Sequence, residues 1–317
     1  MMDPLAGLLD GPRARGAFLL RMVMDPPWSV RIEDRAPLCV MTVARGEAWV
    51  VPDRGAPQKA VRLGPGDVAV VRGPDPYTVA GDPATEPQAW ILPGEVCRTA
   101  AGEDLAERMA LGVRTWGNSE HGAATVLVGT YRMDGEISRR LLDALPPLLV
   151  LERERCDSPL LPWLGEEIVK EEAGQTAVLD RLLDLLLISV LRAWFARPEA
   201  RAPAWYRALG DPVVGRALRL LQNNPGHPWT VALLAAEAGI SRAVLARRFT
   251  ELVGEPPMAY LTGWRLDLAA DLLREPDATL GAVARRVGYG SSFALSAAFK
   301  RVRGVSPREH RSAASAG

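Results

Sequence analysis

The sequence predicts an α+β protein of two domains, in which a β-barrel followed by helices precedes an all-α domain. Its 317 residues are enough for about two domains of ordinary size. Short apolar runs broken by turns extend from about residue 28 to residue 128, and after Tyr131 the apolar spacing changes to three and four. The expected division is a barrel at 1–130, a helical segment at 131–204 and an all-α domain at 205–317.

The strands are predicted from alternating apolar and polar residues and from turn-forming residues between them. Pro37–Pro52 and Val61–Arg72 alternate apolar and polar residues, and Gly64-Pro65-Gly66-Asp67 supplies a turn. Many short strands with regular turns are typical of a sandwich or a small barrel.

Helices are expected at Leu141–Leu151, Leu160–Glu172 and Ala177–Ala196. The third has an apolar face, and two interpretations are open: it packs within its own domain, or it joins two copies of the chain in a homodimer. Residues 197–203 are a candidate linker by composition. The apolar face comprises Leu179, Leu182, Leu183, Leu186, Val190 and Trp194.

Composition excludes several classes of protein. Hydrophobic residues make up 48% and charged residues 24%, as in a globular protein. No charge-free run approaches the ~20 residues of a membrane span, and the N-terminus has acidic residues where a signal peptide needs a basic start. Cys39, Cys97 and Cys156 are odd in number and widely spaced, which fits a reducing compartment. We therefore expect a soluble, cytoplasmic protein with no membrane partner.

The net charge of zero conceals an asymmetry between the two halves. Residues 211–317 contain 14 basic and 9 acidic side chains, a net charge of +5, so the preceding residues carry −5. A basic domain attached to an acidic one is expected where only one of the two binds a polyanion.

An internal duplication carries the functional signal. Ala235–Pro257 aligns with Ala284–Pro307, and in each copy a helix ends at a glycine, a turn follows, and a second helix contains a phenylalanine. This pattern predicts a helix-turn-helix, with Ser241 capping the second helix of the first copy. The matched positions are Gly239 with Gly288, Phe249 with Phe299, Gly254 with Gly304, and Pro257 with Pro307.

Helical spacing assigns faces to the second helix of each copy. Leu245, Phe249 and Leu252 in the first copy, and Leu295 and Phe299 in the second, are expected in the core. The outward residues suit a helix in the major groove of double-stranded DNA, because arginine binds guanine and small side chains permit close approach. The outward residues are Arg242, Ala243, Ala246 and Arg247 in the first copy and Ser291, Ser292, Ala294 and Ala297 in the second, with Lys300, Arg301 and Arg303 placed for phosphates.

The segment Pro257–Glu275 has an apolar stripe and is expected to form a helix that joins the two copies. Recognition helices that enter successive major grooves lie about 34 Å apart. A rigid connection that falls short of this distance favours bending of the DNA.

Residues 213–311 resemble the DNA-binding domain of the AraC/XylS family of bacterial transcription regulators. The resemblance implies base contacts from Ala243, Ala246 and Arg247, promoter or operator DNA and RNA polymerase as partners, and activation more often than repression. The family usually has a polar or basic residue where this chain has Ala297. The residues that carry the resemblance are Trp229-Thr230-Val231, Ala238-Gly239-Ile240-Ser241, Leu245, Arg247, Phe249, Gly254-Glu255-Pro256-Pro257, Trp264-Arg265-Leu266, Ala284, Val287-Gly288-Tyr289, Phe299-Lys300-Arg301 and Gly304-Val305-Ser306-Pro307.

The strand-rich region resembles the cupin-type sensor domains of some AraC-family regulators. The motifs are Gly46-Glu47-Ala48-Trp49, Gly64-Pro65-Gly66-Asp67 and Gly73-Pro74-Asp75-Pro76-Tyr77. Cupin enzymes hold a metal with several histidines, but this chain has only His121, His227 and His310, so we expect no metal and no cofactor. A barrel without ligands for a metal keeps a cavity for a small-molecule effector. The candidate effector-binding residues are Trp28, Cys39, Trp49, Tyr77 and Trp90.

The sequence thus predicts a DNA-binding transcription regulator, not an enzyme, controlled by a small-molecule effector in the cupin-like domain. One alternative is a thiol sensor acting through Cys39, Cys97 or Cys156, which needs an exposed thiol of low pKa. Two further alternatives are a cupin enzyme with a DNA-binding tail and an architectural DNA protein.

Overall fold

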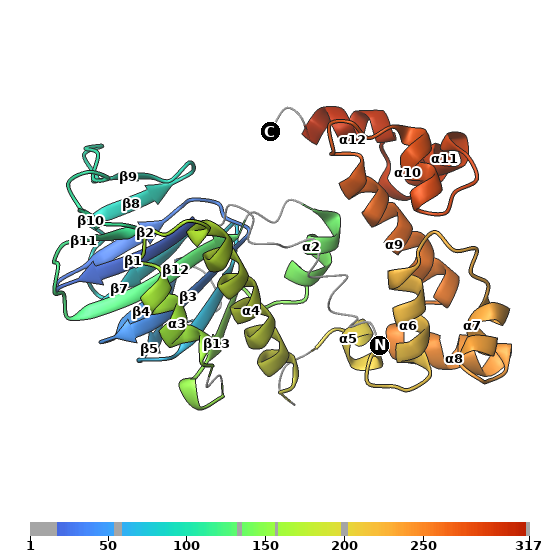
Figure 1. The fold of residues 1–317 in the computed structure, drawn as a ribbon, viewed down its shortest axis with the longest axis horizontal. Coiled ribbons are helices and arrows are strands. Elements are labelled where there is room, and N and C mark those ends of the chain that lie inside the picture. Colours follow the sequence, from blue (N-terminus) through green and yellow to red (C-terminus); the bar gives the residue numbers. More distant parts are fainter. Residues whose placement is uncertain (1–17, 54–58, 132–134, 156–157, 198–201, 315–317) are drawn as a thin grey trace. The chain divides into compact units, whose positions relative to one another are not determined.

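The computed structural model describes residues 18–53, 59–131, 135–155, 158–197 and 202–314. They form two compact units (Figure 1). The β-rich unit lies within residues 12–133 and 145–200, and the helical unit within residues 134–144 and 201–317. The predicted α+β class, with a sheet-rich domain before a helical one, is confirmed.

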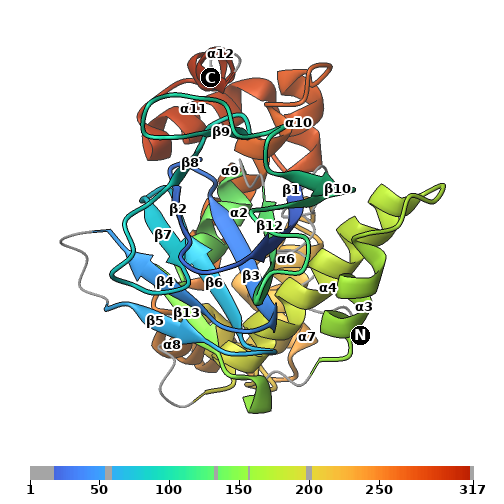
Figure 2. The same ribbon diagram turned by 90° about the vertical axis from the view of Figure 1, so that its left-hand side faces the viewer.

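The larger sheet of the β-rich unit has the strand order β10-β11-β1-β12-β3-β6-β13. Neighbouring strands in it are antiparallel except β1 and β11, and Figure 2 shows β3, β6 and β13 side by side. The strands are β1 (Phe18–Met24), β3 (Leu38–Arg45), β6 (Val68–Arg72), β10 (Ala110–Gly112), β11 (Thr115–Gly117), β12 (Ala124–Tyr131) and β13 (Leu148–Leu151).

The smaller sheet has the order β5-β4-β7-β2-β8-β9. Side chains from the inner faces of the two sheets, such as Met22, Met41, Val50 and Val79, form one buried core, as expected for packed sheets. The strands are β2 (Ser29–Ile32), β4 (Ala48–Pro52), β5 (Val61–Leu63), β7 (Tyr77–Ala80), β8 (Ala89–Leu92) and β9 (Val96–Arg98).

Two helices cover the larger sheet: α3 (Leu160–Glu167) packs on β3, and α4 (Gln175–Phe195) reaches β13 (Figure 1). The predicted apolar face of α4 is buried within the unit from Leu179 to Val190. Gly129 of β12 lets α4 approach closely, since a Cβ there would lie 2.7 Å from Leu183 Cδ2. The Tyr131 hydroxyl, at the end of the same strand, donates a 2.7 Å hydrogen bond to the Leu183 carbonyl. This face of α4 therefore packs within its own domain and is not available as a dimer interface.

The helix predicted at Leu141–Leu151 is wrong for most of its length. A short helix, α2 (Glu136–Leu142), ends before Pro146 and Pro147, and Leu148–Leu151 forms β13 beside β6. Prolines do not continue a helix, and a four-residue apolar run has no periodicity that separates a helix from a buried strand. A 3₁₀ turn follows at Arg153–Arg155.

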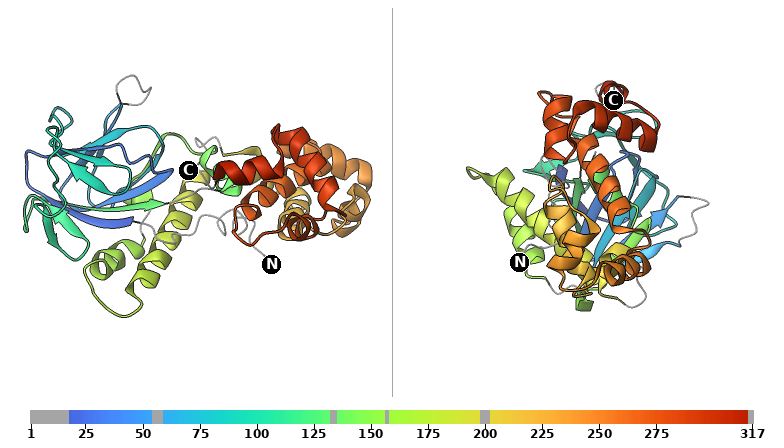
Figure 3. Two further views of the ribbon diagram at one scale, coloured as in Figure 1. Left: turned by 90° about the horizontal axis from the view of Figure 1, so that it is seen from above. Right: turned by 90° about the vertical axis from the view of Figure 1, so that its right-hand side faces the viewer.

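The helical unit contains two cores, one for each copy of the duplication. Leu234, Leu245 and Phe249 belong to the first core, and Val283 and Phe299 to the second. The helix α9 supplies residues to both cores and runs between the two groups of helices (Figures 1 and 3). Besides α2, the helices are α5 (Ala204–Ala208), α6 (Val214–Asn223), α7 (Val231–Glu237), α8 (Arg242–Val253), α9 (Pro257–Leu272), α10 (Leu280–Arg286), α11 (Ser292–Arg303) and α12 (Pro307–Ala314).

The two copies share a glycine in the turn and a serine that caps the second helix. Gly239 and Gly288 adopt φ values of 70° and 83° in the turns, where residues other than glycine are disfavoured. The hydroxyl of Ser241 caps α8 by accepting a hydrogen bond from the Val244 amide at 3.3 Å, and Ser291 caps α11 in the same way. The predicted helix-turn-helix is confirmed in both copies, and the predicted cap at Ser241 is confirmed in the first; the cap at Ser291 was not predicted.

Truncation of Leu186 to alanine is expected to destabilise the β-rich unit by about 2–5 kcal/mol, because the side chain is 1% exposed and its loss leaves a cavity. The adjacent Leu185 is 47% exposed, so Leu185→Ala is expected to change the free energy of unfolding by less than about 0.5 kcal/mol. Urea titrations followed by circular dichroism measure both. Equal losses in the two variants would contradict the packing of α4.

Candidate nucleic-acid interface and ligand pocket

The second helix of the first copy, α8, divides into a buried and an exposed face. Leu245 and Phe249 are fully buried, and Arg242, Ala243 and Arg247 are exposed. Two residues depart from the sequence interpretation: Ala246 is half-buried, and Leu252, expected in the core, is 37% exposed. The helix thus presents a short basic surface along one side.

The arginines of α8 differ in their partners. Arg248 makes hydrogen bonds of 3.0 Å and 2.5 Å from Nε and Nη2 to Asp211, whose other oxygen caps the start of α6. Arg247 faces Glu251 one turn away, with 3.7 Å between Nε and Oε1 and both side chains exposed. Exposed pairs of this kind contribute only about 0.3–0.5 kcal/mol. Arg247 can therefore leave its partner for a ligand more easily than Arg248 can.

The corresponding helix of the second copy, α11, is less basic at its N-terminal end. Ser291, Ser292, Ala294 and Ala297 are exposed, as the spacing predicts. Lys300 and Arg301 are exposed at its C-terminal end.

Arg303 is not placed as the sequence analysis predicted. It is 16% exposed and pairs with Glu136 of α2 at 3.2 Å and Asp267 of α9 at 2.6 Å. Both carboxylates come from outside the helix-turn-helix, so helical spacing gave no sign of them. Arg303 is therefore occupied within the protein and is not presented to phosphates.

Sequence reasoning missed Phe293 on α11. It is a large apolar side chain, 83% exposed, directly after Ser292 in α11. A signal was present, because Phe293 precedes Leu295 by only two positions and so falls outside the i, i+4 register of Leu295 and Phe299.

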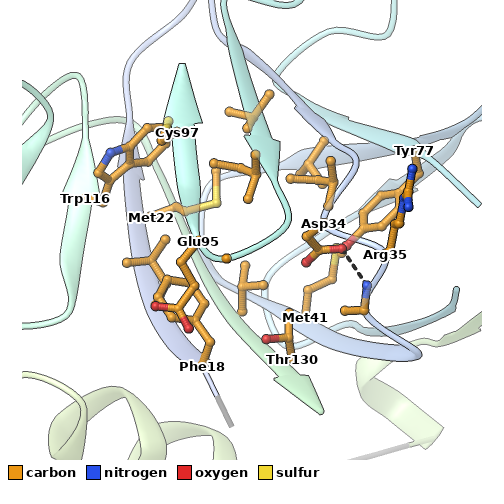
Figure 4. Close-up of a pocket in the computed structure, with 18 of the residues that line it drawn as sticks. Phe18, Met22, Asp34, Arg35, Met41, Tyr77, Glu95, Cys97, Trp116 and Thr130 are labelled. Carbon is orange, nitrogen blue, oxygen red and sulfur yellow. Dashed lines mark hydrogen bonds between the residues drawn. The ribbon is translucent and has the colours of Figure 1, made fainter. Parts of the chain in front are cut away.

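A cavity of about 410 Å³ lies inside the β-rich unit. Most of the side chains that line it are apolar and come from both sheets, with a few polar ones among them (Figure 4). This combination of apolar walls and few polar groups is typical of small-molecule sites. The apolar wall includes Phe18, Leu20, Met22, Met41, Ile91 and Val128.

The polar groups of the pocket include those of Asp34, Arg35, Tyr77, Glu95 and Thr130. Asp34 accepts a 3.0 Å hydrogen bond from the Ala36 amide, and burial raises the pKa of its carboxyl despite that bond (Figure 4). Burial also raises the pKa of the Tyr77 hydroxyl. These groups can fix the orientation of a polar substituent on an otherwise apolar ligand.

Backbone strain coincides with this pocket. Arg35 and Glu95 have φ values of 59° and 65°, a region that non-glycine residues enter at a cost of about 1–3 kcal/mol each. Such conformations are retained where the surrounding structure fixes them, and they cluster at ligand sites.

The predicted effector-binding residues fall into three groups. Tyr77 lines the pocket. Trp28 and Cys39 are buried in the core of the β-rich unit and are not among the lining residues. Trp49 and Trp90 are half-buried and lie outside the pocket, because each alternates with an inward neighbour, Val50 for the one and Ala89 for the other.

The cysteines do not match the thiol-sensor interpretation. Cys39 and Cys97 are free and buried, although Cys97 lines the pocket. Burial raises the pKa of Cys39 to about 12 and that of Cys97 to about 11. A reactive thiol needs the opposite shift. Cys156 lies outside the described residues.

No three His, Cys, Asp or Glu side chains in the described ranges come together as metal ligands would. None of the described helices combines the length and the apolar character required to cross a membrane.

The whole chain is similar to known transcription regulators. A family model described as Cupin matches residues 3–196, and one described as a helix-turn-helix domain matches residues 234–313. A Streptomyces lividans protein named as an AraC-like transcription regulator is 32% identical over 315 residues, covering 98% of each chain. The chain belongs to the AraC family of transcription regulators.

Further matches to this AraC-family regulator cover the whole chain or its DNA-binding domain. The HTH-type transcriptional regulator AlkR of Acinetobacter baylyi is 26% identical over 318 residues, 98% of this chain and 99% of AlkR. Among solved structures, the DNA-binding domain of the global transcriptional factor AdpA, in complex with a target DNA, is 35% identical with a TM-score of 0.31. That match covers 33% of this chain and 93% of the AdpA domain.

Proposed function

We propose that this regulator binds an operator in double-stranded DNA through α8 and α11, each in a major groove. The support is the duplication itself: two capped helices, each with an exposed face, are attached to the common helix α9. Lys300 and Arg301 contact phosphates. The base-facing residues are Arg242, Ala243, Ala246 and Arg247 of α8, and Ser291, Ser292, Ala294 and Ala297 of α11.

The pocket is the observation that supports control by an effector. Its volume falls within the range of about 300–1,000 Å³ that small-molecule sites occupy, and its walls are mainly apolar. The effector is a small, largely apolar molecule whose polar substituent meets Asp34, Arg35 or Glu95. No cofactor is needed for this role, which is regulatory and not enzymatic.

Membership of the AraC family supports the remaining parts of the proposal. The regulator acts in the cytoplasm as a homodimer and activates transcription together with RNA polymerase. Because the apolar face of α4 is buried, the dimer interface uses another surface of the chain.

Replacement of Arg247 by alanine is expected to weaken binding to a selected operator by about 1–3 kcal/mol and to relax the preference at one base pair. The matched control is Arg248→Ala, because Arg248 is held by Asp211 and is not directed at a base. Duplexes selected from a random library by the wild-type protein, followed by titrations against single base-pair variants, measure both effects. A uniform loss across unrelated sequences would identify Arg247 as a phosphate contact.

The effector proposal is tested by native mass spectrometry of the full-length protein purified from cells. We expect a dimer that carries an additional organic mass, and we expect Val128→Trp, which fills the pocket, to lose that mass. Trp90→Ala, outside the pocket, is the control and keeps it. An identical mass on wild type and Val128→Trp would place the ligand elsewhere.

A further inference from the structure

The exposed ring of Phe293 contributes almost no buried apolar surface to the folded domain. An aromatic side chain buries about 150–250 Å² when it is covered, yet this one is 83% exposed. It lies in the first turn of α11, the turn that enters a major groove deepest in helix-turn-helix proteins.

The neighbours of Phe293 permit close approach to a base. Ala297 follows one turn later on the same side of the helix, and Ser292 and Ala294 flank it, all exposed and small. Lys300, two turns along, brings a positive charge to the phosphates. In the major groove the thymine C5-methyl group is the apolar feature that distinguishes one base from the others.

We infer that Phe293 is a specificity-determining residue that contacts a thymine methyl group in the half-site bound by α11. The inference rests on the proposed DNA-binding function. An apolar contact from Phe293 to a base would replace the polar or basic contact that Ala297 cannot make.

Replacement of single thymines by deoxyuridine in a selected operator removes only the methyl group. One buried methyl corresponds to about a fourfold change in affinity. We expect wild type to lose about that factor at one or two thymines in the α11 half-site, and Phe293→Ala to be insensitive there. The control is Val302→Ala, on the same helix and 55% exposed in wild type, which keeps the wild-type response.

Uniform tolerance of deoxyuridine by wild type overturns the inference, as does an unchanged response in Phe293→Ala. A loss of transcription activation in Phe293→Ala with unchanged DNA affinity would instead assign the side chain to a protein partner. If wild type selects no sequence at all, the proposed function fails as well.

A different observation concerns α2. The chain leaves the β-rich unit after β12, forms α2 within the helical unit, and returns as β13. Val128, Thr130 and Tyr131, at the end of β12, line the pocket. Only residues 132–135 separate the pocket wall from the first residue of α2.

Within the helical unit, α2 is attached by partly buried charges. The Asp271 carboxylate accepts hydrogen bonds from the Glu136 amide at 2.5 Å and the Ile137 amide at 3.1 Å. Arg140 pairs with Asp267, and its guanidinium lies 5.7 Å from the centre of the Trp264 ring. These contacts place α2 on α9.

Carboxylates of α2 and α9 also pair with a residue of α11. Glu136 and Asp267 both bind Arg303, the last residue of α11. Ile137 packs on Trp264 in a small cluster of its own. A shift of α2 therefore changes the partners of α9 and of α11 together.

The geometry points to α2 as the element through which occupancy of the pocket alters the DNA-binding helices. A ligand against Thr130 and Tyr131 changes the position of the strand end that continues into α2. This proposal rests on the proposed effector control and names the residues that carry it.

Two pocket-filling substitutions, Val128→Phe and Thr130→Met, stand in for a ligand. Each is combined with Arg140→Ala, which removes the ion pair with Asp267 and so weakens the attachment of α2 to α9, or with the matched control Arg139→Ala, whose side chain is 65% exposed and faces Glu136. We expect filling to change the affinity for a selected operator by about fivefold or more in wild type and in Arg139→Ala. In Arg140→Ala we expect less than about a twofold change.

Hydrogen exchange of the α2 amides in the free protein gives a readout that does not need DNA. We expect pocket filling to change exchange in α2, whereas a purely structural role for α2 predicts no change. Equal affinity shifts in Arg140→Ala and Arg139→Ala, or unchanged exchange in both filled variants, overturn the proposal. If affinity shifts equally but exchange in α2 is unaffected, effector control stands and α2 is not its route.

Discussion

The helix α9 is the constraint on which the DNA-binding arrangement depends. Its first half contributes Tyr260 and Leu261 to the core of the first helix-turn-helix, and its second half contributes Leu266, Ala269 and Ala270 to the core of the second. At 16 residues it is about 24 Å long. The two recognition helices are thus held by one continuous helix and not by a flexible linker. In the proposed complex with DNA, any mismatch between the separation of these helices and the helical repeat has to be taken up by the DNA.

In the β-rich unit, successive side chains along a strand point to opposite faces of the sheet, so neighbouring residues contact different parts of the structure. Along β1, Phe18, Leu20 and Met22 line the pocket, and Leu19 lies on the side of Leu183 of α4. On β12, Thr130 lines the pocket and Gly129 meets α4. The alternation of side chains therefore gives this sheet a cavity wall on one face and a helix-packing surface on the other.

Features set by residues close together in the sequence could be predicted, and features set by contacts between distant segments could not. The cap at Ser241 and the turns at Gly239 and Gly288 follow from residues within one helix-turn-helix, and the structure has them where the sequence predicts them. The strand β13 was missed because its four residues become a strand only when β6 pairs with them. Large aromatic residues were poor guides to the pocket, since Trp49 and Trp90 fall on the outer side of their strands while smaller residues form its wall.

Because α2 belongs to the helical unit but lies between two segments of the β-rich unit in the sequence, the order of the chain does not match its division into units. A gene fragment that starts after residue 201 encodes both helix-turn-helix copies but omits the helix that satisfies Asp271, Asp267 and Arg303. Domain exchange by simple recombination at that point would remove both amide donors of the Asp271 carboxylate and leave Asp267 and Arg303 to pair only with each other, at a cost in stability. A β-rich domain grafted from elsewhere would have to bring a matching segment of its own. A single cut between the two halves of the sequence therefore does not separate the two units of the structure.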